Sequence, residues 1–234
     1  MPREPLFVPF RGLGLVSLPT EGSACSVAVQ QRGTQTFITT SVDRQFQVFT
    51  ADKLRLAFVG PQMKAKIGAL AVHGDITFTA RGQDIIAFHR QEAVATFSGH
   101  VSDVYQLFVF GDSLISIAED QTMHVWSMSD ATRLGTLELT NREASVTSMC
   151  HPHTYLNKLL LGDDSGVMTL LNVRTLRTIF TFPSFGSGIL CIEQSPALDV
   201  VAVGLADGRI LLHNLKTNAT LLQFTQSEGP VTSL

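Results

Sequence analysis

The fold is decided by the stretch Phe97-SGHVSDVYQLFVFGDSLISIAEDQTMHVW-Ser127. Glycine, aspartate and serine interrupt it every few residues, which is typical of short strands joined by tight turns. After the acidic turn position Asp120, the apolar residues Met123 and Val125 are two positions apart, so both point to one face of a strand. The stretch therefore predicts consecutive strands and not a helix.

The same pattern occurs five times along the chain. The copies are Asp43-RQFQV-Phe49, Gly82-QDIIA-Phe88, Asp120-QTMHV-Trp126, Ser165-GVMTL-Leu171 and Asp207-GRILL-His213. Their first positions are 39, 38, 45 and 42 residues apart. A second apolar residue recurs with the same period, at the position where a fourth, outer strand would end. These residues are Phe58, Phe97, Leu137, Phe182 and Phe224. A period of about 40 to 45 residues with strand alternation indicates the four-stranded blades of a β-propeller.

We expect an all-β chain that forms part of one propeller over residues 1–234. The predicted blades cover approximately residues 22–60, 61–99, 100–140, 141–184 and 185–227. Residues 228–234 repeat the opening of the earlier blades and are predicted to form the first strand of a sixth. A ring that stops there leaves sheet edges without a neighbour. We therefore expect a fragment that is unstable or aggregates when it is expressed alone.

Composition limits the classes of function. Seventeen basic and twenty acidic residues give a formal net charge of −3, which is not the footprint of a nucleic-acid-binding domain. Cys25, Cys150 and Cys191 are odd in number, far apart and set in apolar stretches, so we expect reduced thiols. No apolar run approaches the roughly 18 residues of a membrane span. We expect an intracellular protein without a membrane partner.

Residues 97–127 resemble a WD40 repeat. Gly99 and His100 open the blade, Ser116 stands on the second strand, Asp120 lies in the following turn and Trp126 is on the third strand. The resemblance implies a hydrogen-bonded structural tetrad of His100, Ser116, Asp120 and Trp126. A buried imidazole and a buried indole each need a partner, and a turn aspartate can accept the imidazole N–H.

The other four copies depart from this motif. The turn aspartate is replaced by Gly82 and Ser165, and the tryptophan by Phe49, Phe88, Leu171 and His213. We therefore expect a complete tetrad in the third blade alone.

Almost the whole chain is similar to the Utp21 family. The resemblance rests on Leu6-FVPFRGLGLVS-Leu18, His151-PHTYLNKLLLG-Asp163, the run from Tyr155 to Phe182 and Val200-VAVGLADGRILLHNLK-Thr217. It implies a nucleolar scaffold of the UTP-B module in the small-subunit processome, which supports pre-rRNA processing. The implied partners are other UTP-B subunits and processome proteins, with pre-rRNA and U3 small nucleolar RNA reached through the assembly. It implies neither a cofactor nor a small-molecule substrate.

Two features imitate a hydrolase. Phe110-GDS-Leu114 resembles the nucleophile motif of the Gly-Asp-Ser-Leu hydrolases, but the chain lacks the Asp-x-x-His that would supply the base. We expect this segment to be a turn between two strands. His100, Ser116 and Asp120 are also the residue types of a catalytic triad, but the tetrad accounts for Trp126 and the repeat as well. We therefore expect no enzymatic activity.

The sequence raises three further possibilities: a zinc site, an RNA-binding surface and a different WD40 function. His151-Pro-His153 is too short for a structural zinc site, which requires four Cys or His ligands. The basic cluster around the first connection between blades favours a solvated rim over an RNA site, because no aromatic residues alternate with Lys53, Arg55, Lys64 and Lys66. The alternative function is a WD40 adaptor of another complex, such as a ubiquitin ligase substrate receptor that recognises peptides at the central channel.

Overall fold

The computed structural model describes residues 16–17, 27–139, 144–225 and 228–234. Twenty strands in these ranges form five antiparallel sheets of four strands each. In every sheet the strands follow one another in chain order, so each blade is a simple meander. The described ranges hold no helix of the length and hydrophobicity that a membrane crossing requires. The expected all-β architecture of five blades is confirmed.

The strand bounds are as follows. Blade one contains β1 (Val27–Arg32), β2 (Gln35–Val42), β3 (Gln45–Thr50) and β4 (Arg55–Val59). Blade two contains β5 (Ala69–His73), β6 (Ile76–Arg81), β7 (Asp84–His89) and β8 (Glu92–Phe97). Blade three contains β9 (Val104–Phe110), β10 (Ser113–Ala118), β11 (Thr122–Ser127) and β12 (Arg133–Glu138). Blade four contains β13 (Val146–Cys150), β14 (Lys158–Asp163), β15 (Met168–Asn172) and β16 (Arg177–Thr181). Blade five contains β17 (Ile189–Gln194), β18 (Val200–Leu205), β19 (Ile210–Asn214) and β20 (Ala219–Phe224).

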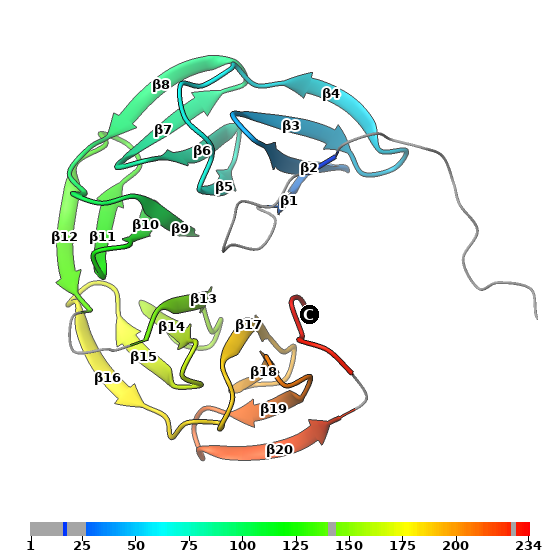
Figure 1. The fold of residues 1–234 in the computed structure, drawn as a ribbon, viewed down its shortest axis with the longest axis vertical. Helices are drawn as coiled ribbons and strands as arrows, with labels where there is room; N and C mark the ends of the chain where they lie inside the picture. The colour runs from blue at the N-terminus through cyan, green and yellow to red at the C-terminus, as the bar shows by residue number, and fades with distance from the viewer. Residues whose placement is uncertain (1–15, 18–26, 140–143, 226–227) are drawn as a thin grey trace, which may run out of the picture.

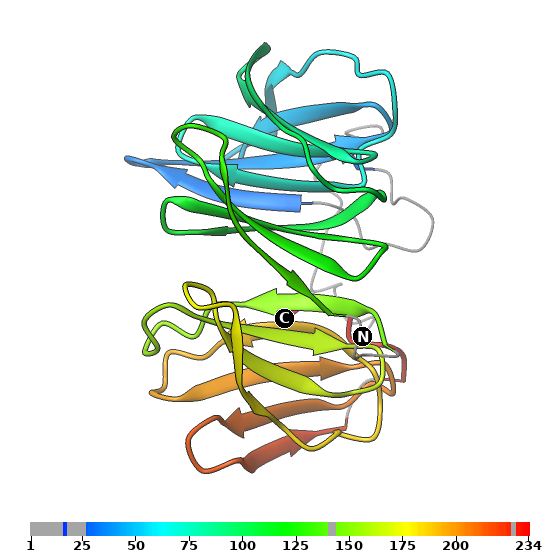
Figure 2. The ribbon, with the colours of Figure 1, turned by 90° about the vertical axis from the view of Figure 1, so that its left-hand side faces the viewer.

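The five sheets are arranged along an arc around a common axis. The first strand of each sheet lies innermost and the fourth strand lies on the outer circumference (Figure 1). In the side view the sheets lie one above another, and their strands run across the thickness of the ring (Figure 2). Among the described strands, the arc remains open between blades one and five (Figure 1).

The hydrophobic core lies between neighbouring sheets. Four buried clusters are present, and each combines residues of two consecutive blades. Phe97 at the end of β8 meets Trp126 of blade three with ring centroids 5.8 Å apart, and Phe182 after β16 meets His213 of blade five at 5.4 Å. In blades two and four, the second recurring apolar residue thus packs on the next blade.

A small residue on the second strand makes room for the next blade. A Cβ atom on Gly162 would approach Cγ2 of Ile189 to 2.7 Å, and one on Gly204 would approach Cγ1 of Val231 to the same distance. The backbone N–H of Val231 also donates to the carbonyl of Leu205 over 3.1 Å. Val231 therefore occupies, against blade five, the place that Ile189 occupies against blade four.

The strand predicted at residues 228–234 is not formed. A strand requires a ladder of backbone hydrogen bonds to a neighbouring strand, and Val231 makes one backbone–backbone hydrogen bond to the preceding sheet, to Leu205. The sequence pattern identified the correct packing position, but no partner strand holds it in a ladder.

A β-bulge recurs at one position in all five outer strands. The pairing shifts next to the residues that stand at the tryptophan position, so one residue of the outer strand is left unpaired. These bulged residues are Ala57, Val94, Leu134, Ile179 and Leu221. The last four are exposed hydrophobic residues, with 47 to 61% of their surface accessible. The bulge turns their side chains away from the cores between blades.

Candidate functional site

Four elements of blade three bring polar side chains into its core. His100 precedes β9, Ser116 lies on β10, Asp120 lies in the turn before β11, and Trp126 is on β11. The side chains of His100, Ser116 and Trp126 are almost completely buried, whereas Asp120 is half-buried. Buried polar groups of this kind must satisfy one another because water does not reach them.

The hydrogen bonds form one continuous chain. Trp126 Nε1–H donates to Ser116 Oγ over 2.8 Å, and Ser116 Oγ lies 2.7 Å from His100 Nε2. On the other side of the ring, His100 Nδ1 lies 3.1 Å from Thr122 Oγ1. Because the indole can only donate, the Ser116 hydroxyl hydrogen is available for Nε2, which leaves the imidazole proton on Nδ1.

Asp120 reaches His100 through Thr122 and not directly. Thr122 Oγ1–H donates to Asp120 Oδ1 over 2.6 Å, and the Thr122 backbone N–H donates to the same oxygen over 3.0 Å. The Asp120 backbone N–H donates to Ser102 Oγ over 2.8 Å. Thr122 is therefore a fifth member of the network. Its signal in the sequence is an Asp followed two positions later by Thr, the spacing of an Asx turn.

The pKa values of both titratable groups in the network are lowered, which favours a neutral imidazole and a charged carboxylate. Burial, together with the neighbouring His124, lowers the pKa of His100 to about 4. Burial alone would raise the pKa of Asp120, but hydrogen bonds from Thr122 and Ser102 outweigh it and lower that pKa. At neutral pH an ionised Asp120 thus accepts from Thr122 while His100 remains uncharged.

A second histidine, which sequence reasoning left unassigned, extends the site. The His124 ring stacks on His100 with centroids 3.9 Å apart, and Arg133 Nη1 lies 3.2 Å from His124 Nε2. Burial lowers the pKa of His124 as well. Gly99 is required beside them, because it has a φ of +152° and its Cβ would meet Trp126 and Arg133 at 3.3 Å.

The geometry leaves the Ser116 oxygen inaccessible to a substrate. Ser116 is fully buried, and its oxygen is already bonded to Trp126 and His100, so no substrate carbonyl can approach it. Gly111 and Asp112 form the turn between β9 and β10, and Ser113 begins β10. Phe110-GDS-Leu114 is therefore a hairpin turn, as expected.

The other residues singled out from the sequence do not come together in one site. Ser165 stands at the turn position of blade four, but its hydroxyl donates to the buried Asp163 over 2.7 Å, so a carboxylate still caps that turn. The rings of His151 and His153 are 5.9 Å apart, and the described ranges contain no cluster of three His, Cys, Asp or Glu side chains suited to a metal. Lys53, Arg55, Lys64 and Lys66 are all exposed.

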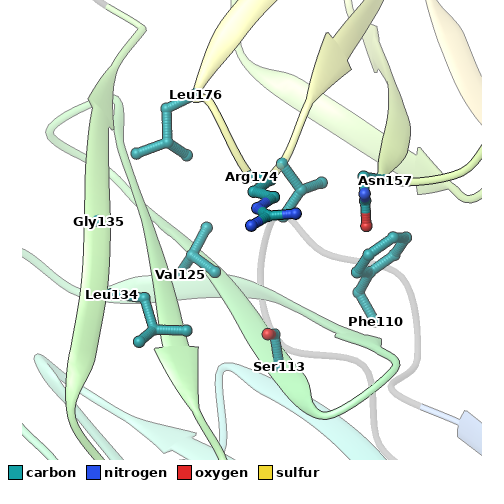
Figure 3. A pocket seen from close by; sticks show the side chains of 9 residues that line it. Phe110, Ser113, Val125, Leu134, Gly135, Asn157, Arg174 and Leu176 are labelled. Atoms are coloured by element: carbon teal, nitrogen blue, oxygen red, sulfur yellow. The ribbon is translucent and has the colours of Figure 1, made fainter.

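A pocket of about 230 Å³ lies between blades three and four. Figure 3 shows its lining side chains, which come from β11, β12 and the β9–β10 hairpin on one side and from turns of blade four on the other. The lining residues are Phe110, Ser113, Val125, Leu134, Gly135, Asn157, Val173, Arg174 and Leu176.

Meandering four-stranded blades with a buried His-Ser-Trp network define a WD40-type β-propeller. The first-propeller model of one such family, WDR36/Utp21, matches residues 38–234, and the chain belongs to this family.

The curated relatives agree with this assignment. The chain is 36% identical over 98% of its length to WD repeat-containing protein 36 of Homo sapiens. It is 36% identical over 97% of its length to the U3 small nucleolar RNA-associated protein 21 homolog of Schizosaccharomyces pombe. The identity to U3 small nucleolar RNA-associated protein 21 of Saccharomyces cerevisiae is 28% over 98% of the chain. The chain spans about a quarter of the length of each relative, 25% in every case.

Solved structures support the fold alone. The computationally designed Ika8 protein superposes with a TM-score of 0.69 at 18% identity, covering 90% of this chain and 64% of the other. A chain of the mitotic checkpoint complex superposes with a TM-score of 0.73 at 16% identity, covering 89% of this chain and 67% of the other.

Proposed function

We propose that the protein is a non-catalytic scaffold of the small-subunit processome, which supports U3-dependent pre-rRNA processing and small-subunit biogenesis in the nucleolus. The observation that carries the proposal is the 36% identity, over 97% of the chain, to a relative named for its association with U3 small nucleolar RNA. The proposed partners are UTP-B subunits and other processome proteins, with pre-rRNA and U3 RNA reached through the assembly.

The geometry of the buried network fits a scaffold. His100 bonds Ser116 and Thr122, and Asp120 Oδ1 accepts from Thr122, so these side chains hold the turns of blade three together instead of facing a substrate. We propose that His100, Ser116, Asp120 and Trp126 form the structural tetrad of this blade, with Thr122 as its bridge. A rigid frame of sheets leaves recognition to exposed loops and to the grooves between blades.

Affinity purification of the tagged full-length protein from nuclear extract tests this function. Co-purification of UTP-B subunits together with U3 small nucleolar RNA is the expected result. An unrelated tagged WD40 protein from the same extract serves as the control. Recovery of a ubiquitin ligase or a signalling complex, without U3 RNA, would leave the propeller intact and overturn the function.

A further inference from the structure

The pocket between blades three and four has an apolar wall formed by both blades. Phe110, Val125 and Leu134 contribute from blade three, and Val173 and Leu176 from blade four (Figure 3). Val125 and Val173 are buried, whereas 61% of the Leu134 surface is exposed at the rim. An apolar ligand would therefore remove Leu134 from water and contact a preformed base.

Two local features of β12 create this space. Leu134 is the bulged residue, since Val125 pairs with Gly135 and Trp126 pairs with Arg133. Gly135 follows it, and a Cβ there would clash with Cδ1 of Leu176. A glycine next to a bulge is thus what lets Leu176 of the neighbouring blade come close to β12.

The volume suits one side chain better than a small molecule. Pockets that hold drug-sized ligands measure about 300–1,000 Å³, and this pocket holds about 230 Å³. A single bulky side chain inserted from a partner chain is a common anchor in protein interfaces.

A positive charge lines the pocket beside the apolar wall, because Arg174 is an exposed lining residue. The Arg174 side chain extends among Phe110, Val125 and Asn157 in Figure 3. Its backbone N–H is fixed by Asn172 Oδ1 over 2.9 Å, and within the described ranges no carboxylate forms an ion pair with its guanidinium. A guanidinium in this position is suited to bind a carboxylate with two parallel hydrogen bonds.

We propose that this pocket binds a peptide segment of a partner protein in which a bulky aliphatic residue stands next to an acidic residue. The aliphatic side chain fills the space between Leu134 and Leu176, and the neighbouring carboxylate pairs with Arg174. RNA fits the site less well, because phosphate tracking requires several cations and exposed aromatic faces. The pocket has one cation, and the Phe110 ring already packs edge-on against His151 with centroids 4.7 Å apart.

The proposed scaffold function does not specify a ligand for this pocket. The test uses the full-length protein and a fluorescein-labelled peptide, Gly-Ser-Leu-Asp-Asp-Ser-Gly, in fluorescence anisotropy titrations. Replacing the leucine by alanine, or both aspartates by asparagine, should weaken binding by about tenfold or more, since each removes one of the two contacts.

Matched variants connect the binding to this pocket. Leu134→Glu and Arg174→Glu should each weaken binding of the parent peptide by about tenfold or more. Leu221→Glu changes the bulged residue at the same position of β20, and Arg177→Glu reverses an exposed charge on β16; neither should alter binding. Arg174→Glu should in turn prefer a peptide with lysines in place of the aspartates.

Several outcomes would overturn the proposal. These are equal binding of the three peptides, no measurable binding of the parent peptide, or equal losses in the control variants. Competition by oligouridine RNA that is sensitive to Arg174→Glu but not to Leu134→Glu would assign the surface to nucleic acid. Self-association abolished by Leu134→Glu would assign it to a second copy of the chain. None of these results bears on the purification experiment, so the proposed function can stand or fall separately.

Discussion

Replacing Thr122 by valine should destabilise the protein through the loss of one hydroxyl group. That hydroxyl joins His100 Nδ1 at 3.1 Å to Asp120 Oδ1 at 2.6 Å. Valine has nearly the same shape and an equal preference for strands, so the substitution opens no cavity and does not disfavour β11. The buried imidazole N–H then loses its acceptor, which costs about 2 kcal/mol.

The effect can be read from a single fluorophore. Trp126 is the only tryptophan of the chain, and its indole N–H is bonded within the same network. Its fluorescence during heating therefore reports the unfolding of blade three. A loss of about 2 kcal/mol corresponds to a melting temperature lower by about 4–8 °C in a chain of this size.

Thr122→Ser is the matched control because it keeps the hydroxyl. It should melt clearly above Thr122→Val. Equal melting temperatures of the wild type and Thr122→Val would refute the reasoning, since the hydroxyl would then contribute nothing to the network. Equal losses in both variants would instead point to the packing of the threonine methyl group.

Three further predictions concern stability. Asp120→Ala should cost about 1–3 kcal/mol by removing the carboxylate that accepts from Thr122, and an unchanged melting temperature would count against the tetrad. His100 has a pKa of about 4 in the folded chain against 6.5 when unfolded, so the unfolded state takes up the proton first. The neutral His100 imidazole contributes its full share to the free energy of unfolding above pH 6.5, and this share is lost towards pH 4 by up to about 1.4 kcal/mol per pH unit. Urea unfolding midpoints should therefore fall less steeply across this pH range in His100→Asn than in the wild type. Gly162→Ala should cost about 1–3 kcal/mol in urea unfolding, because its Cβ would press on Ile189, whereas Gly229→Ala, which meets no atom within 4 Å, should be neutral.

The blades could be predicted from the sequence because their signal is repeated. A strand pattern with a turn residue and an apolar outer-strand landmark recurs five times, and each copy constrains the others. The strand predicted at residues 228–234 failed for the opposite reason. Its residues carry the pattern of an opening strand, but a pattern cannot supply the neighbouring strand to which it must bond.

The buried network was only partly predictable. Residue types identify His100, Ser116, Asp120 and Trp126 as candidates, but they do not show that a threonine stands between the aspartate and the imidazole. That path depends on the backbone of the turn, where Gln121 adopts a positive φ of 62° and brings the Thr122 hydroxyl over the carboxylate. The bulges escaped prediction because one extra residue in a short alternating strand hardly changes its pattern.

The placement of the cores between consecutive sheets has a consequence for synthesis on the ribosome. Each buried cluster joins a blade to the one that follows it in the chain, as Phe46 of blade one meets Phe88 of blade two with ring centroids 5.7 Å apart. A newly emerged sheet therefore finds its packing partner already made, and it does not wait for residues that are still to be translated. The blades can fold in the order in which they are synthesised. Each new blade buries the apolar face of the preceding blade, so only the apolar face of the newest blade is exposed at any time.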